Sequence, residues 1–446
     1  MINQIRILQV VQGFPPRQFG GTEIYTYNLS NELARRHEVH LFYPKWSAKS
    51  KNRVSSFIER EQLVIHELNL SNWSFLEKIV RAVDFERSYK NKKVEKVFED
   101  LLNEIKPHIV HFQHLINLST SLIEVAKSKN ISTVLTLHDC WFICPRTRLL
   151  KSDYSICNGP DENGTKCFEC WSEGKSEALA NYLAKYFFPR GASIRVLNLI
   201  LRLLNPSKKF RKRKEYIKSL LLRVDRIVVP SKFVGRLFVN YGITGDKILL
   251  SENGYLLSRF DGFHNKKREE DRIVFGFLGG VDKHKGVDVL IEAFNKIRNK
   301  NVELRIYGDY DPKSVYFRHF KAKIKNVNVR FLGRFLDVRE PFSEIDVLIV
   351  PSICYEAGGP TVVLEAFIAR KPAIASESGS IPEFVKNGVN GLLFEMGNPD
   401  DLCDKIKAVI ENPGLIEKFK VNIKAVRTIE EQANELERLY LYIRAG

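Results

Sequence analysis

The chain has 446 residues, 44% of them hydrophobic and 11% aromatic, which is typical of a folded protein of two or more domains and excludes a largely disordered one. No apolar run is long enough to span a bilayer, and residues 1–11 start directly as a strand without a signal peptide, so we expect the protein in the cytoplasm. The formal net charge of +17 favours anionic partners, which include nucleotide diphosphates, acidic lipid head groups and nucleic acid.

The opening of the chain predicts a strand, a loop, a helix and a second strand. Residues 5–11 form an apolar run typical of a buried strand, and apolar residues recur at helical spacing from Ile24 to Arg36. The loop between them contains the pair Gly20 and Gly21 but not the Gly-x-Gly-x-x-Gly fingerprint, which argues against a dinucleotide at this end. A plain turn containing glycines would have the same sequence.

Strands and helices continue to alternate as far as residue 139. A charged amphipathic helix is predicted over Lys92–Ile105, and strands over 108–114 and 131–139. This alternation predicts a doubly wound parallel sheet, an α/β fold whose ligands lie beyond the carboxyl ends of the strands. His138 lies at the carboxyl end of the strand predicted over 131–139. His111 and His114 are more typical of structural or acceptor-side histidines.

Five of the seven cysteines lie between Cys140 and Cys170. Four of them have the spacing Cys-x12-Cys-x9-Cys-x2-Cys in a loop rich in Gly, Pro and Asp, which suits a tetrahedral structural zinc. These four are Cys144, Cys157, Cys167 and Cys170. Unligated buried thiols and redox pairs are the alternatives, and disulfides are disfavoured in a reducing cytoplasm.

Residues 175–222 combine apolar helical faces and aromatic residues with the basic cluster 208–214. Such a mixture suits a helix at the surface of an anionic membrane, and equally a helical insertion packed on the domain with a solvated basic face. No recognised nucleic-acid fold motif accompanies the basic cluster, so we do not expect a nucleic-acid partner.

A second α/β domain is predicted after the charged segment 265–272. The strand 273–278 leads through Gly279 and Gly280 to Lys283 and Lys285 and then to a helix over 287–297. The spacing does not fit a P-loop, so ATP hydrolysis is not indicated. The lysines suit an anionic ligand, although a solvated lysine pair is the plain alternative.

The stretch 346–366 is the most informative part of the sequence. A buried strand over 347–350 leads through small residues to a helix over 361–369 with a proline in its first turn, so backbone N–H groups and the helix dipole suit a diphosphate. Glu356 and Glu365 flank this loop and could accept hydrogen bonds from sugar hydroxyls. These features together describe a sugar-nucleotide site. The alternative is an ordinary strand, loop and helix with two surface glutamates.

Three segments resemble the signature of retaining GT-B glycosyltransferases of family 4. They are the stretch 346–366, residues 273–286 and the Gly20–Glu23 loop. The resemblance is strongest over 273–394 and clear in 1–45, 105–157 and 224–254. It implies two Rossmann-like doubly wound domains facing across a cleft, over 1–258 and 259–428. Residues 429–446 would then form a helix returning to the first domain.

The resemblance also implies roles for individual residues. Glu365 would hold the nucleotide ribose, Glu356 would face the donor sugar, and Lys285, helped by Lys283, would neutralise the diphosphate. His138 would lie beside the donor's hexose, so the implied catalytic residues are His138, Lys285 and Glu356. The implied donor-binding residues are Gly20, Gly21, Gly279, Gly280, Lys283, Lys285, Gly333, Arg334, Glu356, Ala357, Gly358, Gly359, Pro360, Thr361 and Glu365.

Two positions depart from the family pattern. Eight residues separate the glutamates where the family usually has seven, so either the loop bulges or Glu356 is displaced. Gly280 stands where an arginine is usual, which leaves more of the phosphate charge to Lys285. Asp309-x-Asp311 is not interpreted as a catalytic metal site, because the GT-B reaction needs no bound metal.

The expected function is therefore retaining transfer of a sugar from a nucleotide diphosphate sugar, with UDP or GDP, to a glycan or lipid-linked acceptor. Cell-surface polysaccharide or glycolipid assembly is the expected context, with the enzyme cytoplasmic or peripheral on the inner face of the membrane. A nucleotide-sugar epimerase of GT-B-like fold and a non-catalytic sugar-nucleotide-binding protein are the alternatives.

Overall fold

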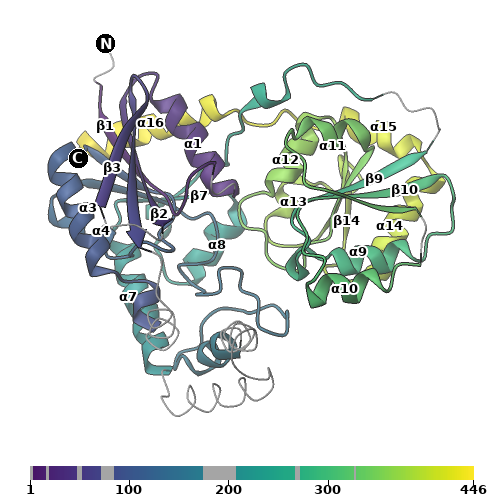
Figure 1. Ribbon diagram of the computed structural model, residues 1–446, viewed down its shortest axis with the longest axis horizontal. Coiled ribbons are helices and arrows are strands. Elements are labelled where there is room, and N and C mark those ends of the chain that lie inside the picture. Colours follow the sequence, from purple (N-terminus) through teal and green to yellow (C-terminus); the bar gives the residue numbers. More distant parts are fainter. Residues whose placement is uncertain are drawn as a thin grey trace. The chain divides into compact units, whose positions relative to one another are not determined.

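The computed structural model describes residues 4–16, 20–47, 53–71, 85–173, 207–266, 272–325 and 328–445. The chain divides into two compact units (Figure 1). The first comprises residues 1–230, 235–251 and 430–446, and the second comprises 231–234 and 252–429. Each unit has its own sheet and its own hydrophobic core, and each is described separately.

The described residues of the first unit form an eight-stranded sheet in the order β3-β4-β2-β1-β5-β6-β7-β8. Its strands are β1 (Arg6–Val10), β2 (Glu38–Ser47), β3 (Arg53–Arg60), β4 (Leu63–Ser71), β5 (Ile109–Phe112), β6 (Ser132–Thr136), β7 (Arg226–Val229) and β8 (Ile248–Leu250). All pairs are parallel except β3 with β4. The predicted doubly wound α/β sheet is confirmed, with an antiparallel edge hairpin that the sequence analysis did not anticipate.

The α-helices of this unit are α1 (Gly21–Leu33), α3 (Lys92–Ile105), α4 (Leu122–Ser128), α7 (Ser207–Arg223), α16 (Ile429–Ala445) and most of α8 (Lys232–Asn240). Short 3-10 turns occur at η1 (Phe85–Ser88) and η2 (Gly245–Lys247). In register, Val10 of β1 pairs with Phe112 of β5, and Phe112 pairs with Leu135 of β6. The carboxyl ends of these three strands therefore meet at one edge, which places the residues that follow them close together.

The second unit contains, within its described residues, a six-stranded parallel sheet in the order β11-β10-β9-β12-β13-β14. The strands are β9 (Ile273–Leu278), β10 (Val302–Tyr307), β11 (Val329–Gly333), β12 (Val347–Val350), β13 (Ala373–Ser376) and β14 (Gly391–Phe394). The helices are α9 (Val287–Phe294), α10 (Val315–Lys321), α11 (Arg339–Glu344), α12 (Thr361–Ile368), α13 (Ile381–Phe384), α14 (Pro399–Glu411) and α15 (Gly414–Val421), with 3-10 turns η3 (Leu257–Phe260) and η4 (Lys283–Lys285).

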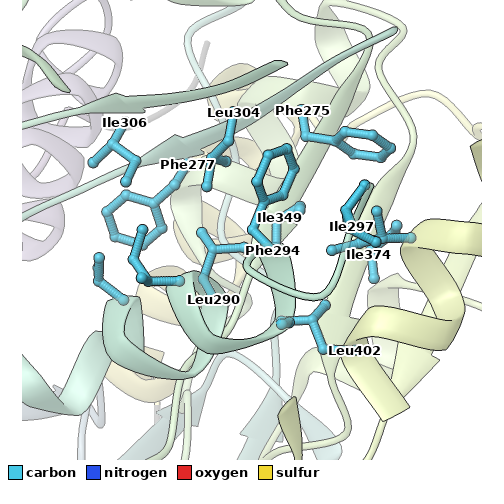
Figure 2. Close-up of a cluster of buried hydrophobic side chains, with 14 of the residues drawn as sticks. Phe275, Phe277, Leu290, Phe294, Ile297, Leu304, Ile306, Ile349, Ile374 and Leu402 are labelled. Carbon is cyan, nitrogen blue, oxygen red and sulfur yellow. The ribbon is translucent and has the colours of Figure 1, made fainter. Parts of the chain in front are cut away.

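Helices cover both faces of this second sheet (Figure 1). On one face, side chains of α9, α10 and α14 pack against the strands, with Leu290, Phe294 and Leu402 against Phe275 and Ile349 (Figure 2). The other face is covered by α11, α12 and α13 through a second buried cluster. Burial on both faces explains why these strands are continuous apolar runs rather than alternating ones.

Two predicted helices end at other residues than expected, because tertiary contacts stop them earlier. The helix expected over Ile24–Arg36 is α1, which starts at Gly21 and stops at Leu33, since the buried ring of His37 accepts a hydrogen bond from the Ile5 N–H of the sheet.

The other error has a similar cause. α9 ends at Phe294 rather than 297, because the next residue, Asn295, bonds to the backbone of residues 323 and 325. The helix expected over 429–446 is α16, and an extended segment that pairs with Tyr255 separates it from α15.

Every helix in the described part of the chain is too short or too polar to cross a lipid bilayer.

Candidate functional site

Glu356 lies in the loop between β12 and α12 and bonds to two side chains. Lys285 Nζ donates to Glu356 Oε1 at 2.8 Å, and Ser352 Oγ donates to the same oxygen at 2.6 Å. Burial alone would raise the pKa of Glu356, but the Lys285 charge and these two hydrogen bonds outweigh it, so the pKa lies below its usual value. Glu356 is thus an anion beside a cation, in the loop that precedes α12.

The backbone around Glu356 is fixed by the turn before α13. Ser380 N–H donates to Glu356 O at 2.8 Å, and Ser380 Oγ accepts from Gly359 N–H at 2.9 Å. Gly379, at φ +57°, packs so closely that a Cβ there would lie 2.3 Å from Glu356 O. Gly359 adopts φ +67°, a conformation that favours glycine, and with eight residues between the two glutamates Glu356 contacts Lys285.

The lysine-bearing loop is held against the same segment. Gly286, at φ +70°, begins α9 where a Cβ would lie 1.8 Å from Pro351 O, and Ile353 N–H donates to His284 O at 3.0 Å. Lys283 pairs instead with Asp288 of α9. The two lysines of the predicted pair therefore have different partners.

Glu365, on α12, has two partners that the sequence analysis missed. Tyr255 Oη donates to Glu365 Oε1 at 2.6 Å, and Arg259 Nη1 lies 3.5 Å from the same oxygen. Burial raises the pKa of Glu365 above its usual value, although the Tyr255 hydrogen bond and the Arg259 charge oppose that shift. Both partners contact Oε1, so the described residues leave Oε2 for a ligand.

Sequence spacing gave no signal for Tyr255 and Arg259, because they lie more than 100 residues before Glu365. The sequence contained one hint of a shared partner: an aromatic hydroxyl and a cation lie four positions apart, at Tyr255 and Arg259.

The remaining predicted residues of this unit lie on the loops around the two glutamates. Gly308 N–H donates to Gly333 O at 2.7 Å, while Arg334 is exposed and lies 3.9 Å from Asp309. The residues between the glutamates, Ala357, Gly358, Gly359, Pro360 and Thr361, connect Glu356 to α12, whose N-cap is Pro360.

In the first unit, His138 follows β6 and belongs to a network of uncharged groups. His138 Nε2 lies 2.8 Å from Gln113 Oε1, which can only accept, so Nε2 carries the proton. Gln113 Nε2 in turn donates to Gln9 Oε1 at 2.9 Å. Burial, followed by the effect of His114, lowers the pKa of His138 to about 3, so its ring is neutral at physiological pH.

The other two histidines of this region have both ring nitrogens engaged. His111 contacts Tyr440 Oη at 2.6 Å and Thr136 Oγ1 at 2.7 Å. His114 accepts from Ile116 N–H at 3.0 Å and lies 3.2 Å from Asp139. These contacts give both rings a structural role.

Gly20 is the N-cap of α1 and Gly21 its first residue. Glu23 of that first turn is buried and accepts from Gln12 Nε2 at 3.0 Å. Tyr25 of the same helix packs edge-on against the His138 ring, with ring centres 5.1 Å apart. The structure thus brings α1 and His138 together at the carboxyl edge of the sheet.

All seven cysteines are free thiols. Burial raises the pKa of Cys144 and Cys170, and raises the pKa of Cys167 to about 12. In the described residues, no group of His, Cys, Asp and Glu side chains is arranged to hold a metal ion. The zinc site stays a prediction.

The basic cluster 208–214 lies on α7, whose apolar residues Phe210, Ile217 and Leu220 are buried in the first unit. Arg213 is buried as well, while Lys208, Lys209, Arg211 and Lys212 are not. This helix is therefore packed on the domain. The aromatic and apolar stretches at 182–188 and 194–204 lie outside the described residues.

Two families match the sequence. Glycosyl transferases group 1 matches residues 259–426, and Glycosyltransferase Family 4 matches residues 19–157. A poly(ribitol-phosphate) alpha-N-acetylglucosaminyltransferase of Staphylococcus aureus is 30% identical over 38% of this chain and 34% of its own. A lipopolysaccharide 1,2-N-acetylglucosaminetransferase of Salmonella typhimurium is 27% identical over 48% of this chain and 61% of its own. The matched segments span about a third to three fifths of these relatives.

Solved structures resemble the whole chain at low sequence identity. Anabaena Alr3699/HepE in complex with UDP and glucose superposes with a TM-score of 0.63 and 16% identity, covering 98% of this chain and 99% of its own. Sucrose-phosphate synthase of Thermosynechococcus elongatus gives a TM-score of 0.67 and 16% identity, covering 99% and 100%. These likenesses show the fold, and with the two family matches they establish that the chain belongs to the group 1 glycosyltransferases of GT-B fold.

Proposed function

We propose that this protein transfers a hexose from a nucleotide diphosphate sugar to a glycan or lipid-linked acceptor, with retention of configuration. The observation that carries the proposal is the contact between Lys285 and Glu356, which lies in the loop that leads into α12. A cation, a carboxylate and the free amides of a helix start are the groups that a charged diphosphate next to a sugar requires.

Each group has a distinct role in this reaction. Lys285 and the backbone N–H groups of Ala357, Gly358 and Thr361 would stabilise the charge that develops on the departing diphosphate, because they are already oriented before the reaction. Glu356 would accept hydrogen bonds from the donor sugar. Glu365 would hold the ribose through Oε2, with Tyr255 and Arg259 as positioning residues that fix its Oε1.

The acceptor hydroxyl would attack from the face that the diphosphate leaves, and its proton would pass to a phosphate oxygen. This route needs no protein base. It agrees with a neutral His138 whose Nε2 proton is already donated to Gln113. The reaction as proposed also needs no bound metal.

The relatives indicate the substrate class. HepE was solved with UDP and with UDP-glucose, and the names of the Staphylococcus and Salmonella relatives give poly(ribitol-phosphate) and lipopolysaccharide. We therefore place this protein in cell-surface polysaccharide or glycolipid assembly, with UDP or GDP as the carrier nucleotide.

Incubation with a panel of UDP- and GDP-sugars tests the proposal. The expected result is release of the nucleoside diphosphate and, with a suitable acceptor, a glycosylated product of retained anomeric configuration. Glu365→Ala should reduce release by about 10²-fold or more, and Lys296→Ala, which removes an exposed ion pair with Asp400, serves as the control. Release unaffected by Glu365→Ala would contradict the assigned site, and an epimerised free sugar nucleotide would indicate an epimerase.

We also propose that the exposed basic face of α7 binds the anionic inner face of the membrane. Because the apolar face of this helix is buried, the attraction would be electrostatic and sensitive to salt. Flotation with anionic vesicles should recover the wild type at low salt. Replacing Lys208, Lys209, Arg211 and Lys212 by Gln should abolish recovery, with the buried Arg213 left in place. Equal recovery of both proteins would count against the proposal.

A further inference from the structure

Four polar side chains on three neighbouring strands of the first unit form a continuous line of hydrogen bonds. Ser56 Oγ of β3 lies 2.8 Å from His66 Nδ1 of β4, and the two residues are opposite one another in the strand register. His66 Nε2 lies 2.8 Å from His40 Nδ1, and His40 Nε2 lies 2.9 Å from Glu38 Oε1, both on β2. These four residues lie outside the candidate functional site.

The carboxylate fixes the direction of every hydrogen bond in this line. A carboxylate can only accept, so His40 Nε2 carries the proton, and in a neutral ring His40 Nδ1 is then an acceptor. His66 Nε2 donates to that nitrogen, which leaves His66 Nδ1 to accept from the Ser56 hydroxyl. Burial, followed by the effect of His40, lowers the pKa of His66 to about 4, so its ring is neutral at physiological pH.

The two ends of the line reach solvent, while its middle is buried. His40 is 7% exposed and His66 is 3% exposed, and their rings lie nearly parallel with centres 5.1 Å apart. Ser56 is exposed, and the side chain of Glu38 is 44% exposed. An accessible hydroxyl that donates to an imidazole, which a further group in turn orients, is the arrangement of an activated nucleophile.

The neighbours of Ser56 on its own face of β3 are apolar. Side chains alternate along a strand, so Val54 and Ile58 lie on the same face as Ser56, and Ile58 is 73% exposed. Both residues could contact the hydrocarbon part of a short acyl group. A charged substrate would find no matching charge on either of these two neighbours.

A backbone donor is also available beside Ser56, because β3 is the edge strand of the sheet in the described residues. Opposed pairs of an antiparallel ladder alternate between hydrogen-bonded and non-hydrogen-bonded pairs, so the N–H of either Ser56 or Phe57 points away from β4. Such an N–H can donate to the carbonyl oxygen of an acyl group that Ser56 attacks.

From this arrangement we infer that Ser56 is a nucleophile that accepts a short acyl group from an activated carboxylic ester. Ser56 Oγ attacks the carbonyl carbon while its proton passes to His66 Nδ1, and the Nε2 proton of His66 passes to His40 Nδ1. The positive charge thereby comes to rest on His40, beside the Glu38 carboxylate. The protons return as the bond from the carbonyl carbon to the alcohol oxygen breaks, so the products are the free alcohol and acylated Ser56. The inference does not depend on the proposed function.

Incubation of the full chain with p-nitrophenyl acetate tests the inference. We expect release of p-nitrophenol and about one acetyl group per chain on Ser56, located by peptide mass spectrometry. Ser56→Ala should abolish the label at this position. Ser55→Ala is the matched control, because Ser55 is an exposed serine on the other face of β3 whose hydroxyl accepts from Asn69 Nδ2 at 2.7 Å. This variant should be acetylated on Ser56 at the wild-type rate.

His66 and Glu38 have tests of their own. His66→Ala should slow acetylation of Ser56 by about 10²-fold or more, and added imidazole should restore part of the rate, which it would not do for a purely structural histidine. Glu38→Gln keeps an acceptor beside His40 but removes the charge, so the rate should fall about tenfold. Because Glu38 is partly exposed, this variant tests the proton path even if His66→Ala fails to fold.

The wild-type result decides the inference first. Absence of acetyl groups from Ser56, or acetylation of Ser55 to the same extent, would overturn the nucleophile. A wild-type rate of acetylation in His66→Ala would overturn the role of the imidazole, and a wild-type rate in Glu38→Gln would overturn the proton path to the carboxylate.

Discussion

The two units differ in the charge of the polar side chains that lie near the carboxyl ends of their strands. In the second unit, Glu356 and Glu365 each contact a cation, and Glu365 also accepts a hydrogen bond from a hydroxyl group. Charged side chains therefore lie within a partly buried site. Around His138 in the first unit, burial keeps the imidazole neutral and its partners are amides. The second unit thus keeps carboxylates and cations at its loops, whereas the first keeps a neutral imidazole.

The largest expected effect on activity comes from replacing Lys285, compared with replacing its neighbour Lys283. Lys285→Ala should lower kcat/KM for the donor by about 10²- to 10³-fold, because it removes the cation beside Glu356. Lys283→Ala should cost about tenfold or less, since Lys283 pairs with Asp288 instead. Steady-state kinetics with the best donor of the panel compares the two variants. Equal losses would mean that the charged site is not organised around Lys285.

A second prediction concerns the close approach of the two loops in the second unit. Gly286→Ala should lower the free energy of unfolding of this unit by about 1–3 kcal/mol or more, because the new Cβ would meet Pro351 O in a backbone conformation that disfavours side chains. Gly262→Ala has nearly the same φ, +71°, and no neighbour within 4 Å, so it isolates the cost of the contact. Calorimetric unfolding should show a larger shift for Gly286→Ala, and similar shifts would argue that the loops do not pack this closely.

Tyr255→Phe should have a smaller effect on donor binding. The substitution removes one hydrogen bond to Glu365, so the donor KM should rise about five- to tenfold while kcat changes little. That hydrogen bond lowers the pKa of Glu365, so its loss should move the acid limb of donor binding to higher pH. A fall in kcat with an unchanged KM and pH profile would contradict a positioning role for Tyr255.

Acid should weaken the first unit through its neutral histidines. Burial lowers the pKa of His111 to about 3 and of His66 to about 4, whereas an unfolded histidine titrates near 6.5. Between these values the unfolded chain binds more protons, so the free energy of unfolding falls as the pH drops below about 6.5, by up to roughly 1.4 kcal/mol per pH unit for each histidine.

Tryptophan fluorescence measures this effect in the first unit alone, because all four tryptophans lie within residues 1–230. His111→Asn should flatten the pH dependence, while changing the exposed His264 of the other unit to Asn should not. A pH dependence that is unchanged in His111→Asn would argue against a buried neutral His111.

The sequence predicted the α/β class and the second unit's strands well, because each strand is buried on both faces and appears as a continuous apolar run. It predicted the edge of the first unit poorly. β3 carries exposed Phe57 and Ile58 and pairs antiparallel with β4, and such an edge hairpin lacks the apolar pattern of a buried strand. Helix ends were missed where a single contact, such as that of His37 with Ile5, decides them.

The sequence by itself determined the local elements of the candidate site, since the glycine loops, Lys285 and the two glutamates occur within short stretches whose geometry follows from local rules. Only the tertiary structure decided their partners. Tyr255 reaches Glu365 across 110 positions, His111 reaches Tyr440 across 329, and Arg213 reaches Trp141 across 72. Such contacts depend on how strands and helices pack, and packing brings together side chains whose separation in sequence carries no information about their distance in space.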